Sequence, residues 1–382
     1  MGLKKLNFNH NSIFILNCEK IKIKGDVVLK ETFTNSIPIS YNKYIKKKIS
    51  IIFLLILVTI LLAMYAINAG SAGISTYDVI KTLIGKGSER FKIIVWNIRM
   101  PRVLSAIVAG TGLSVAGCVT QSILRNPLAS PFTLGISQGA SFGAALAIIV
   151  FGAGTTSNPD SVIINNSYLV VIFAFLGSMG ATLIILMLAK NFKVTPEAMV
   201  LAGVALGSLF SAITMILQYF SDDVQVASVV FWTFGDIGRT SWSDLAIMST
   251  VVGLSLIYFM LNRWNYNALD SGEETAKGLG VDVERIRLIG MFIASLIAAT
   301  ITSFVGIIGF IGLVGPHIMR RLIGSDHRFL IPASSAIGSL ILLASDTLGR
   351  TIISPIVLPV GAITSFLGAP VFLYVLSRGY KK

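Results

Sequence analysis

Residues 49–77 read ISIIFLLILVTILLAMYAINAGSAGISTY and contain no aspartate, glutamate, lysine or arginine. About twenty apolar residues are enough to cross the hydrocarbon core of a bilayer as a helix. This stretch therefore predicts a membrane-spanning helix. Eight further charge-free windows follow it along the chain: 103–124, 126–159, 161–189, 198–221, 245–262, 288–319, 329–345 and 351–377.

The composition supports a membrane protein. Of the 382 residues, 54% are hydrophobic and only 13% are charged. A soluble domain carries about twice that share of charged residues. We therefore expect an all-α integral membrane protein rather than a chain of soluble domains.

One window is too long for a single crossing. Residues 288–319 contain Gly306, Gly309, Gly312 and Gly315, followed by Pro316. Glycine and proline interrupt helices, so we expect two helices here and about ten transmembrane helices in all. The window 126–159 begins with the loop sequence NPLASP, which places its helix at about 133–153.

An even number of crossings puts both ends of the chain on one side of the membrane. On this topology 23 of the 31 lysines and arginines lie on the same side as the termini, and cytoplasmic loops carry such an excess. We expect both termini to be cytoplasmic, in a bacterial cell membrane. The first external loop is an exception, because it carries six basic residues.

Residues 1–48 differ from the rest of the chain. They are polar and rich in lysine, and we interpret them as a cytoplasmic tail without fixed structure, separate from a transmembrane domain at 49–382. The alternation of Ile21 and Ile23 with Lys22 and Lys24 leaves a short strand as the alternative.

Glycines are frequent in two predicted spans. Gly135, Gly139 and Gly143 follow one another at four-residue spacing, and Gly110 and Gly117 lie in the preceding span. Small residues at this spacing allow helices to approach closely. We interpret them as packing positions.

Several kinds of chemistry have no support in the sequence. There is no phosphate-binding G-x-x-x-x-G-K-[ST] motif, so we expect no ATP binding by this chain and no enzymatic activity. Two cysteines and three scattered histidines suggest neither a metal site nor a cofactor. The net charge of +13 is explained by lipid-facing loops rather than by nucleic acid. No charged residue lies in the middle of a predicted span, which disfavours a proton-coupled carrier.

One cytoplasmic segment, 268–285, differs from the other loops. Ser271 and Glu274 have the spacing of a capping box, which predicts a short helix that ends at Gly278 or Gly280. Asp282 then caps a second short helix. Two capped helices between spans fit a docking element for a soluble partner, and an ordinary surface hairpin fits equally well.

Five motifs resemble the FecCD/BtuC permease family, the membrane subunits of ABC importers for ferric siderophores, haem and vitamin B12. They occur in the family's order: RMPR at 99–102; NPLASP at 126–131 with LGISQGA at 134–140; GEETAKGLG at 272–280; GFIGLVGPH at 309–317, followed by Arg320; and LPVG at 358–361 with LGAPVF at 367–372. The resemblance covers about residues 45–380.

The resemblance implies a BtuC-like fold and a set of partners. These are a second permease copy or close homologue, two ATPase subunits, an external substrate-binding protein and membrane lipid. It also implies three groups of residues. ATPase coupling would involve Ser271, Gly272, Glu273, Glu274, Ala276, Gly278 and Gly280; docking of the binding protein would involve Arg99, Arg102 and Arg350; a pathway or gate would involve Gly309, Gly312, Gly315 and Pro316.

The substrate is not fixed by these motifs. A ferric siderophore is favoured by how often the family carries one, and haem or cobalamin remain open. The alternative function is a secondary transporter with a discontinuous helix near 306–316. A membrane-embedded enzyme is disfavoured, because the predicted spans contain no cluster of polar residues that could form a catalytic site.

Overall fold

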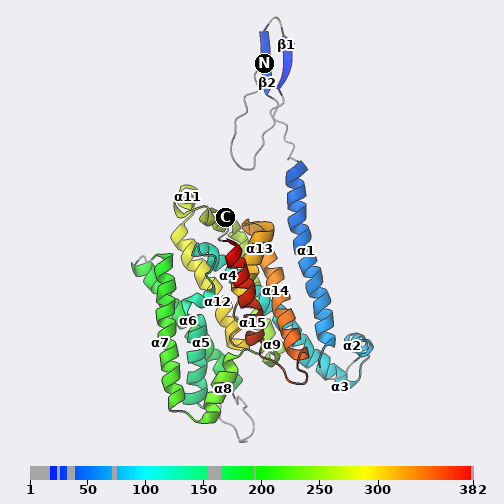
Figure 1. Cartoon of the computed structure of the whole chain (residues 1–382), viewed down its shortest axis with the longest axis vertical. Coiled ribbons are helices and arrows are strands. Elements are labelled where there is room, and N and C mark those ends of the chain that lie inside the picture. Colours follow the sequence, from blue (N-terminus) through cyan, green and yellow to red (C-terminus); the bar gives the residue numbers. More distant parts are fainter. Residues whose placement is uncertain are drawn as a thin grey trace. The chain divides into compact units, whose positions relative to one another are not determined.

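The computed structural model describes residues 18–23, 26–31, 39–70, 75–153, 166–192 and 195–379. The chain divides into two compact units, Met1–Lys48 and Ile49–Lys382. Figure 1 shows the course of the chain.

The first unit contains a β-hairpin. β1 (Cys18–Ile23) pairs antiparallel with β2 (Asp26–Glu31), with Ile21 opposite Val28. These strands include the residues for which the sequence left a strand open, and β-branched residues such as Ile21 and Ile23 favour an extended backbone. A separate cytoplasmic tail at 1–48 stays a prediction. Residues 1–17 lie outside the described part of the chain.

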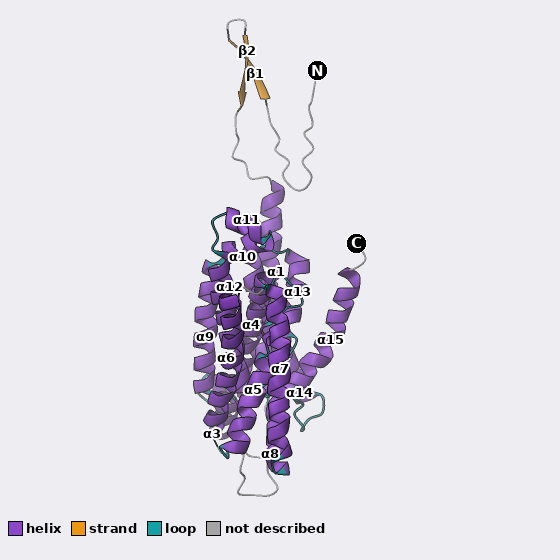
Figure 2. Ribbon diagram, turned by 90° about the vertical axis from the view of Figure 1, so that its left-hand side faces the viewer, coloured by secondary structure: helices purple, strands orange, loops and turns teal. Residues whose placement is uncertain are grey.

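Seven helices are long and apolar enough to cross a membrane within the described residues. They are α1 (Ile39–Asn68), α4 (Met100–Ile123, continuous with the helical residues from Glu89), α6 (Ser167–Phe192), α7 (Pro196–Tyr219), α9 (Trp242–Leu261), α12 (Val283–Val305) and α14 (His327–Thr351). Figure 2 shows the helices of the second unit lying side by side as a bundle.

Shorter helices occupy the remaining predicted windows. They are α5 (Ile136–Ala145, continued by a turn of π-helix to Val150), α13 (Ile311–Ile323) and α15 (Val360–Gly379). The window 288–319 is broken at 306–310, as predicted. Gly306 has φ +81° and Phe310 has φ +67° there, so neither residue can continue a right-handed helix.

Four short helices were not predicted. They are α2 (Thr76–Leu83), α3 (Glu89–Lys92), α8 (Asp223–Thr233) and α10 (Arg263–Asp270). A fifth, α11 (Glu273–Gly278), is the short helix predicted within the segment 268–285. All are at most 11 residues long. Charged residues interrupt or flank them, so a search for charge-free windows passes over them.

The helix α4 lies at the centre of the bundle, against α9, α12, α13 and α14 (Figure 1). Its most apolar window is 78% buried, whereas that of α1 is 11% buried. Glycines allow the close contacts. A side chain at Gly110 would meet the carbonyl of Gly338, and one at Gly139 would meet that of Gly177. The predicted packing role of these glycines is confirmed.

Candidate functional site

The segment 268–285 comprises the end of α10, the whole of α11 and the first residues of α12, with a tight turn between α10 and α11. Gly272 is the N-cap of α11 and has φ +121°, a backbone conformation that suits glycine. The predicted capping box is wrong. Ser271 follows the last residue of α10, and its hydroxyl donates to the Asn267 carbonyl at 3.2 Å instead of capping α11. The turn at Gly272 directs this side chain back along α10.

The far end of α11 is closed by a glycine turn. Gly280 has φ +82°. Its N–H donates to the Lys277 carbonyl at 2.9 Å, and the N–H of Val281 donates to the Ala276 carbonyl at 3.0 Å. These two bonds form a Schellman motif. Gly280 is therefore the predicted terminator, while Gly278 is the last helical residue.

The predicted second short helix is the first turn of α12. Asp282 caps it, and its carboxylate accepts from the Arg285 N–H at 3.1 Å. The helix then continues to Val305 without a break. The segment is therefore directly continuous with a membrane span.

One ion pair holds α11 against α12, with Glu273 Oε2 at 2.9 Å from Arg287 Nη2. Within α11, Lys277 Nζ lies 3.4 Å from Glu273 Oε1. Burial acts to raise the pKa of Glu273, but its bonds to Arg287 and Lys277 outweigh burial and lower this pKa. Ala276 is fully buried beneath. The opposite surface is exposed, with Glu274 90% exposed and Leu279 69% exposed.

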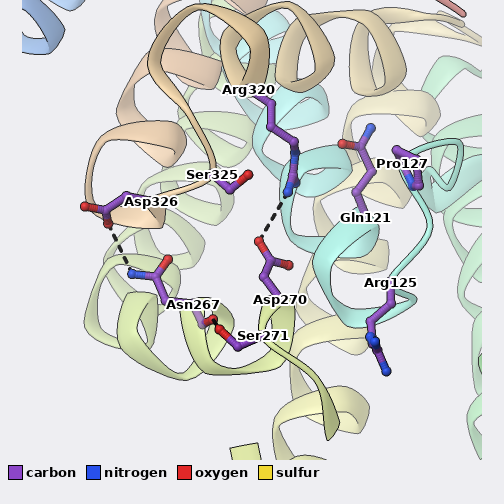
Figure 3. Close-up of a pocket in the computed structure, with 9 residues that line it drawn as sticks. All are labelled: Gln121, Arg125, Pro127, Asn267, Asp270, Ser271, Arg320, Ser325 and Asp326. Atoms are coloured by element: carbon purple, nitrogen blue, oxygen red, sulfur yellow. Dashed lines mark hydrogen bonds and ion pairs between the residues drawn. The ribbon is translucent and has the colours of Figure 1, made fainter. Parts of the chain in front are cut away.

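A cavity of about 650 Å³ opens beside α10. Figure 3 shows Asp270 and Arg320 pointing toward one another across it, with Arg320 Nη1 at 3.2 Å from Asp270 Oδ2. Polar and charged side chains supply most of its wall. The lining residues are Gln121, Arg125, Pro127, Asn267, Asp270, Ser271, Arg320, Ser325 and Asp326.

A polar network next to the cavity joins α10 to the spans. Asp270 Oδ2 lies 3.2 Å from His327 Nε2, and the Ser122 hydroxyl lies 2.8 Å from the same nitrogen. Asn267 accepts from the His327 N–H at 2.8 Å and donates to Asp326 at 3.1 Å. The network thus connects the end of α10 with α4 and the start of α14.

Asp270 is ionised in this setting. Burial acts to raise its pKa, but the hydrogen bond with His327 and the charge of Arg320 outweigh burial, so the pKa lies below its ordinary value. Sequence reasoning missed this network. Asp270 and His327 are 57 residues apart, and no local pattern predicts their contact. Among the described residues, no three His, Cys, Asp or Glu side chains form a metal-binding group.

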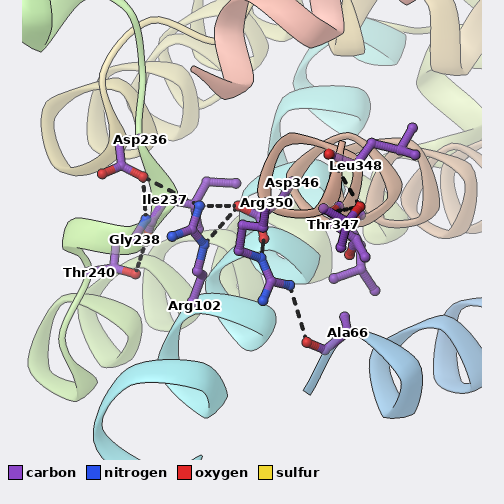
Figure 4. A network of polar contacts seen from close by, with 12 residues as sticks. Ala66, Arg102, Asp236, Ile237, Gly238, Thr240, Asp346, Thr347, Leu348 and Arg350 are labelled. Atoms are coloured by element: carbon purple, nitrogen blue, oxygen red, sulfur yellow. Dashed lines mark hydrogen bonds and ion pairs between the residues drawn. The ribbon is translucent and has the colours of Figure 1, made fainter. Parts of the chain in front are cut away.

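A second network lies at the other end of the bundle (Figure 4). Asp346 on α14 is fully buried and accepts from two arginines. Arg102 Nη2 lies 2.8 Å from Asp346 Oδ1, and Arg350 Nε lies 3.1 Å from Asp346 Oδ2. Asp236, in the loop before α9, lies 3.6 Å from Arg102. The structure therefore brings two of the predicted docking arginines together on one carboxylate.

Arg99 and Arg350 bind the end of α1. Arg99 Nη1 donates to the carbonyls of Ile67 and Asn68 at 2.7 and 3.0 Å. Arg350 donates to those of Ala69 and Ala66 at 3.1 and 3.2 Å. Four carbonyls that a helix end leaves unpaired are satisfied in this way. Arg99 and Arg350 are 5% and 8% exposed, so they are not presented to an external protein in this conformation.

A family model described as the FecCD transport family matches residues 55–378. The chain belongs to the FecCD transport family. The FecCD resemblance and the helical membrane fold are therefore confirmed.

Relatives and one solved structure span the same region. A putative ABC transporter permease protein of Methanocaldococcus jannaschii is 54% identical over 91% of this chain and 99% of its own. The hemin transport system permease protein of Yersinia pestis is 36% identical over 88% and 98%. An inward-facing conformation of a putative metal-chelate type ABC transporter has a TM-score of 0.75 and 28% identity, covering 86% and 99%.

The glycines predicted to form a pathway or gate do not all lie in the same environment. Gly312 lies against the backbone of Leu113 and Gly117, and Gly315 lies against Ser114. These two glycines pack α13 onto α4. Pro316, which is also in α13, is buried. Around Gly309 there is more space, with Ser365 Oγ at 3.8 Å from an added Cβ. A pathway role remains a prediction, and Gly309 is the position with room for it.

Proposed function

We propose that this chain imports an iron chelate, with a ferric siderophore as the favoured cargo and haem or cobalamin as the alternatives. Two copies would form the translocation pathway, two ATPase subunits would drive it, and an external binding protein would deliver the chelate. The observation that carries this proposal is the segment 268–285. It is exposed on one side and joined to four helices of the bundle on the other. The names of relatives support the cargo class, since they include a permease for Fe(3+)-citrate in Bacillus subtilis.

The proposed coupling runs through rigid contacts. An ATPase that engages Glu274 and Leu279 would displace α11. The Glu273–Arg287 pair would pass this movement to α12, and the Asp270–His327 network would pass it to α4 and α14. Bistable packed elements can transmit small displacements in this way.

The alternative of a secondary transporter loses its main support. It required an open site at the break between α12 and α13. Protein backbone fills part of this region, because the Asp236 N–H donates to the Val305 carbonyl at 2.8 Å and the Val360 N–H donates to the Gly235 carbonyl at 3.2 Å. Family membership also favours an ATP-driven importer.

The test is a reconstituted transport assay. The permease is co-purified with its ATPase, placed in liposomes with the binding protein, and offered a ferric siderophore, haem and cobalamin in parallel. We expect ATP-dependent uptake of the siderophore only when all components are present. Uptake driven by an ion gradient without the ATPase would refute the proposal, and ATP-dependent uptake of haem or cobalamin alone would correct the cargo.

A further inference from the structure

The first external loop contains a well-formed helix, α2. Ser75 caps its start, where the Asp78 N–H donates to the Ser75 hydroxyl at 3.2 Å. Gly85, with φ +82°, closes its end. The N–H of Gly85 donates to Thr82 at 3.0 Å and that of Lys86 donates to Lys81 at 2.9 Å, which is again a Schellman motif. The helix therefore has a fixed orientation.

One face of α2 is packed onto the bundle. Val79 is 5% exposed and Val95 is fully buried. Both belong to a small apolar cluster together with Ile67, Phe91, Ile94 and Met100. This cluster joins α2 to the end of α1 and to the start of the span that contains α4.

The other apolar face of α2 is bare. Tyr77, Ile80 and Ile84 are 71%, 53% and 67% exposed. Their spacing of three and four residues places them on one side of the helix. We call these three residues the outer stripe.

The outer stripe lies between two candidate membrane spans along the chain. The helix α2 follows α1 after seven residues, and the next long span begins at Glu89. Nearby, the Trp96 and Trp242 rings have their centroids 6.4 Å apart, and Trp242 Nε1 donates to the Trp96 carbonyl at 2.8 Å. Tryptophans are enriched at the boundary between lipid and water.

We propose that α2 is an interfacial helix whose outer stripe inserts between lipids of the outer leaflet. Tyr77, Ile80 and Ile84 would lie among the first acyl carbons. The exposed cations Lys81, Lys86 and Arg90 would bind lipid phosphates. An amphipathic helix with this distribution of residues partitions into the interface.

The proposal explains the one departure from the expected charge distribution. Lysine and arginine are normally concentrated in cytoplasmic loops, yet the loop that contains α2 carries six basic residues. Arg99 and Arg102 are used inside the protein. The remaining cations surround an exposed apolar helix, where anionic headgroups give them a function that is independent of transport.

The experiment measures lipid contact residue by residue along α2. Single cysteines are introduced at positions 76–84 in a Cys18→Ser background, since the remaining Cys118 is buried. Each is labelled with bimane in the full-length protein, in nanodiscs of phosphatidylcholine and phosphatidylglycerol. We expect doxyl-lipid quenching to peak at Tyr77→Cys, Ile80→Cys and Ile84→Cys, and iodide to quench Lys81→Cys more strongly. Because Val79 and Thr82 are buried, the cysteines at these positions give the baseline.

A second measurement tests the cations. In nanodiscs rich in phosphatidylglycerol, Lys81→Gln combined with Lys86→Gln should weaken the partitioning of α2 into the lipid about fivefold per cation, as read from doxyl-lipid quenching at the outer stripe. In nanodiscs of phosphatidylcholine alone, the same pair of substitutions should leave this quenching unchanged. Equal iodide quenching at the outer stripe and at Lys81→Cys would overturn the proposal. So would shielding of the outer stripe that occurs only when the binding protein or a second permease copy is added.

Discussion

The two ends of the bundle use the same pairing of aspartate and arginine for different purposes. Near α11, Asp270 lies at the edge of a 650 Å³ cavity, and the neighbouring helix exposes Glu274 and Leu279. At the other end, Asp346 is fully buried between Arg102 and Arg350, and these side chains face inward. Residue type alone therefore does not identify a docking surface. Exposure of the charged groups does.

The largest effect on stability is expected at Asp346. Asp346→Ala would leave two largely buried guanidinium groups without their shared anion. Removing one partner of a buried ion pair costs about 3–5 kcal/mol, so we expect a large fall in thermal stability of the purified permease. The matched control is Asp236→Asn, at an aspartate that is 47% exposed and 3.6 Å from Arg102. Equal effects of the two variants would show that burial of Asp346 is not what stabilises this end.

The next largest effect is expected at Gly280. In Gly280→Val, a β-branched residue must adopt φ +82°, which costs about 1–2 kcal/mol or more. We expect ATP hydrolysis by the assembled complex to continue while import falls about tenfold. Gly278→Ala is the control, because Gly278 is helical and a Cβ there meets open space. Normal import by Gly280→Val would remove the coupling role from this end of α11.

Asp270 allows the link between α10 and the spans to be tested by pH. Its pKa is lowered in the folded protein, so the stabilisation that it gives is complete above its unfolded pKa of about 4. This stabilisation is lost as the pH falls through the folded pKa. The protection factors of the α10 amides, which correct for the intrinsic exchange rate at each pH, should therefore stay constant from pH 7 to pH 5 and fall only below pH 4. Asp270→Asn should already exchange faster at pH 7, and an unchanged rate would separate α10 from this network.

The smallest effect on stability is expected at Glu274. It is 90% exposed, and an exposed ion pair contributes at most about 1 kcal/mol. Glu274→Gln should leave the thermal unfolding temperature of the permease nearly unchanged and weaken binding of the ATPase. A large loss of stability would mean that this surface is structural, as it is around Asp346.

Much of the fold could be predicted because membranes impose simple rules. Charge-free windows identified the spans, and the glycines of 306–315 located the break between α12 and α13. The sequence left Gly278 and Gly280 open as the end of α11, and the positive φ of Gly280 decides between them. The positive φ of Gly272 defeated the capping-box prediction, since a local motif does not report the direction in which the chain turns.

The networks could not be predicted in the same way. Arg102 and Asp346 are 244 residues apart, and Asp346 stands at the edge of a charge-free window, where a charge is expected to face water. The family resemblance assigned these arginines to docking of the binding protein, which stays a prediction, and no sequence pattern indicated that two of them share a buried carboxylate. Only the packing of α14 against α4 shows that the carboxylate is enclosed.

The attachment of α1 has a consequence for the lipid environment in which the permease works. The charge-free part of this helix, 49–68, is about 30 Å long, which matches a hydrocarbon core of about 30 Å and leaves no excess length for a thicker or thinner bilayer. It is held by its last carbonyls, and its apolar window is only 11% buried. A helix fastened at one end accommodates hydrophobic mismatch by tilting. Changes in bilayer thickness should therefore be absorbed by the inclination of α1, without repacking the helices around α4.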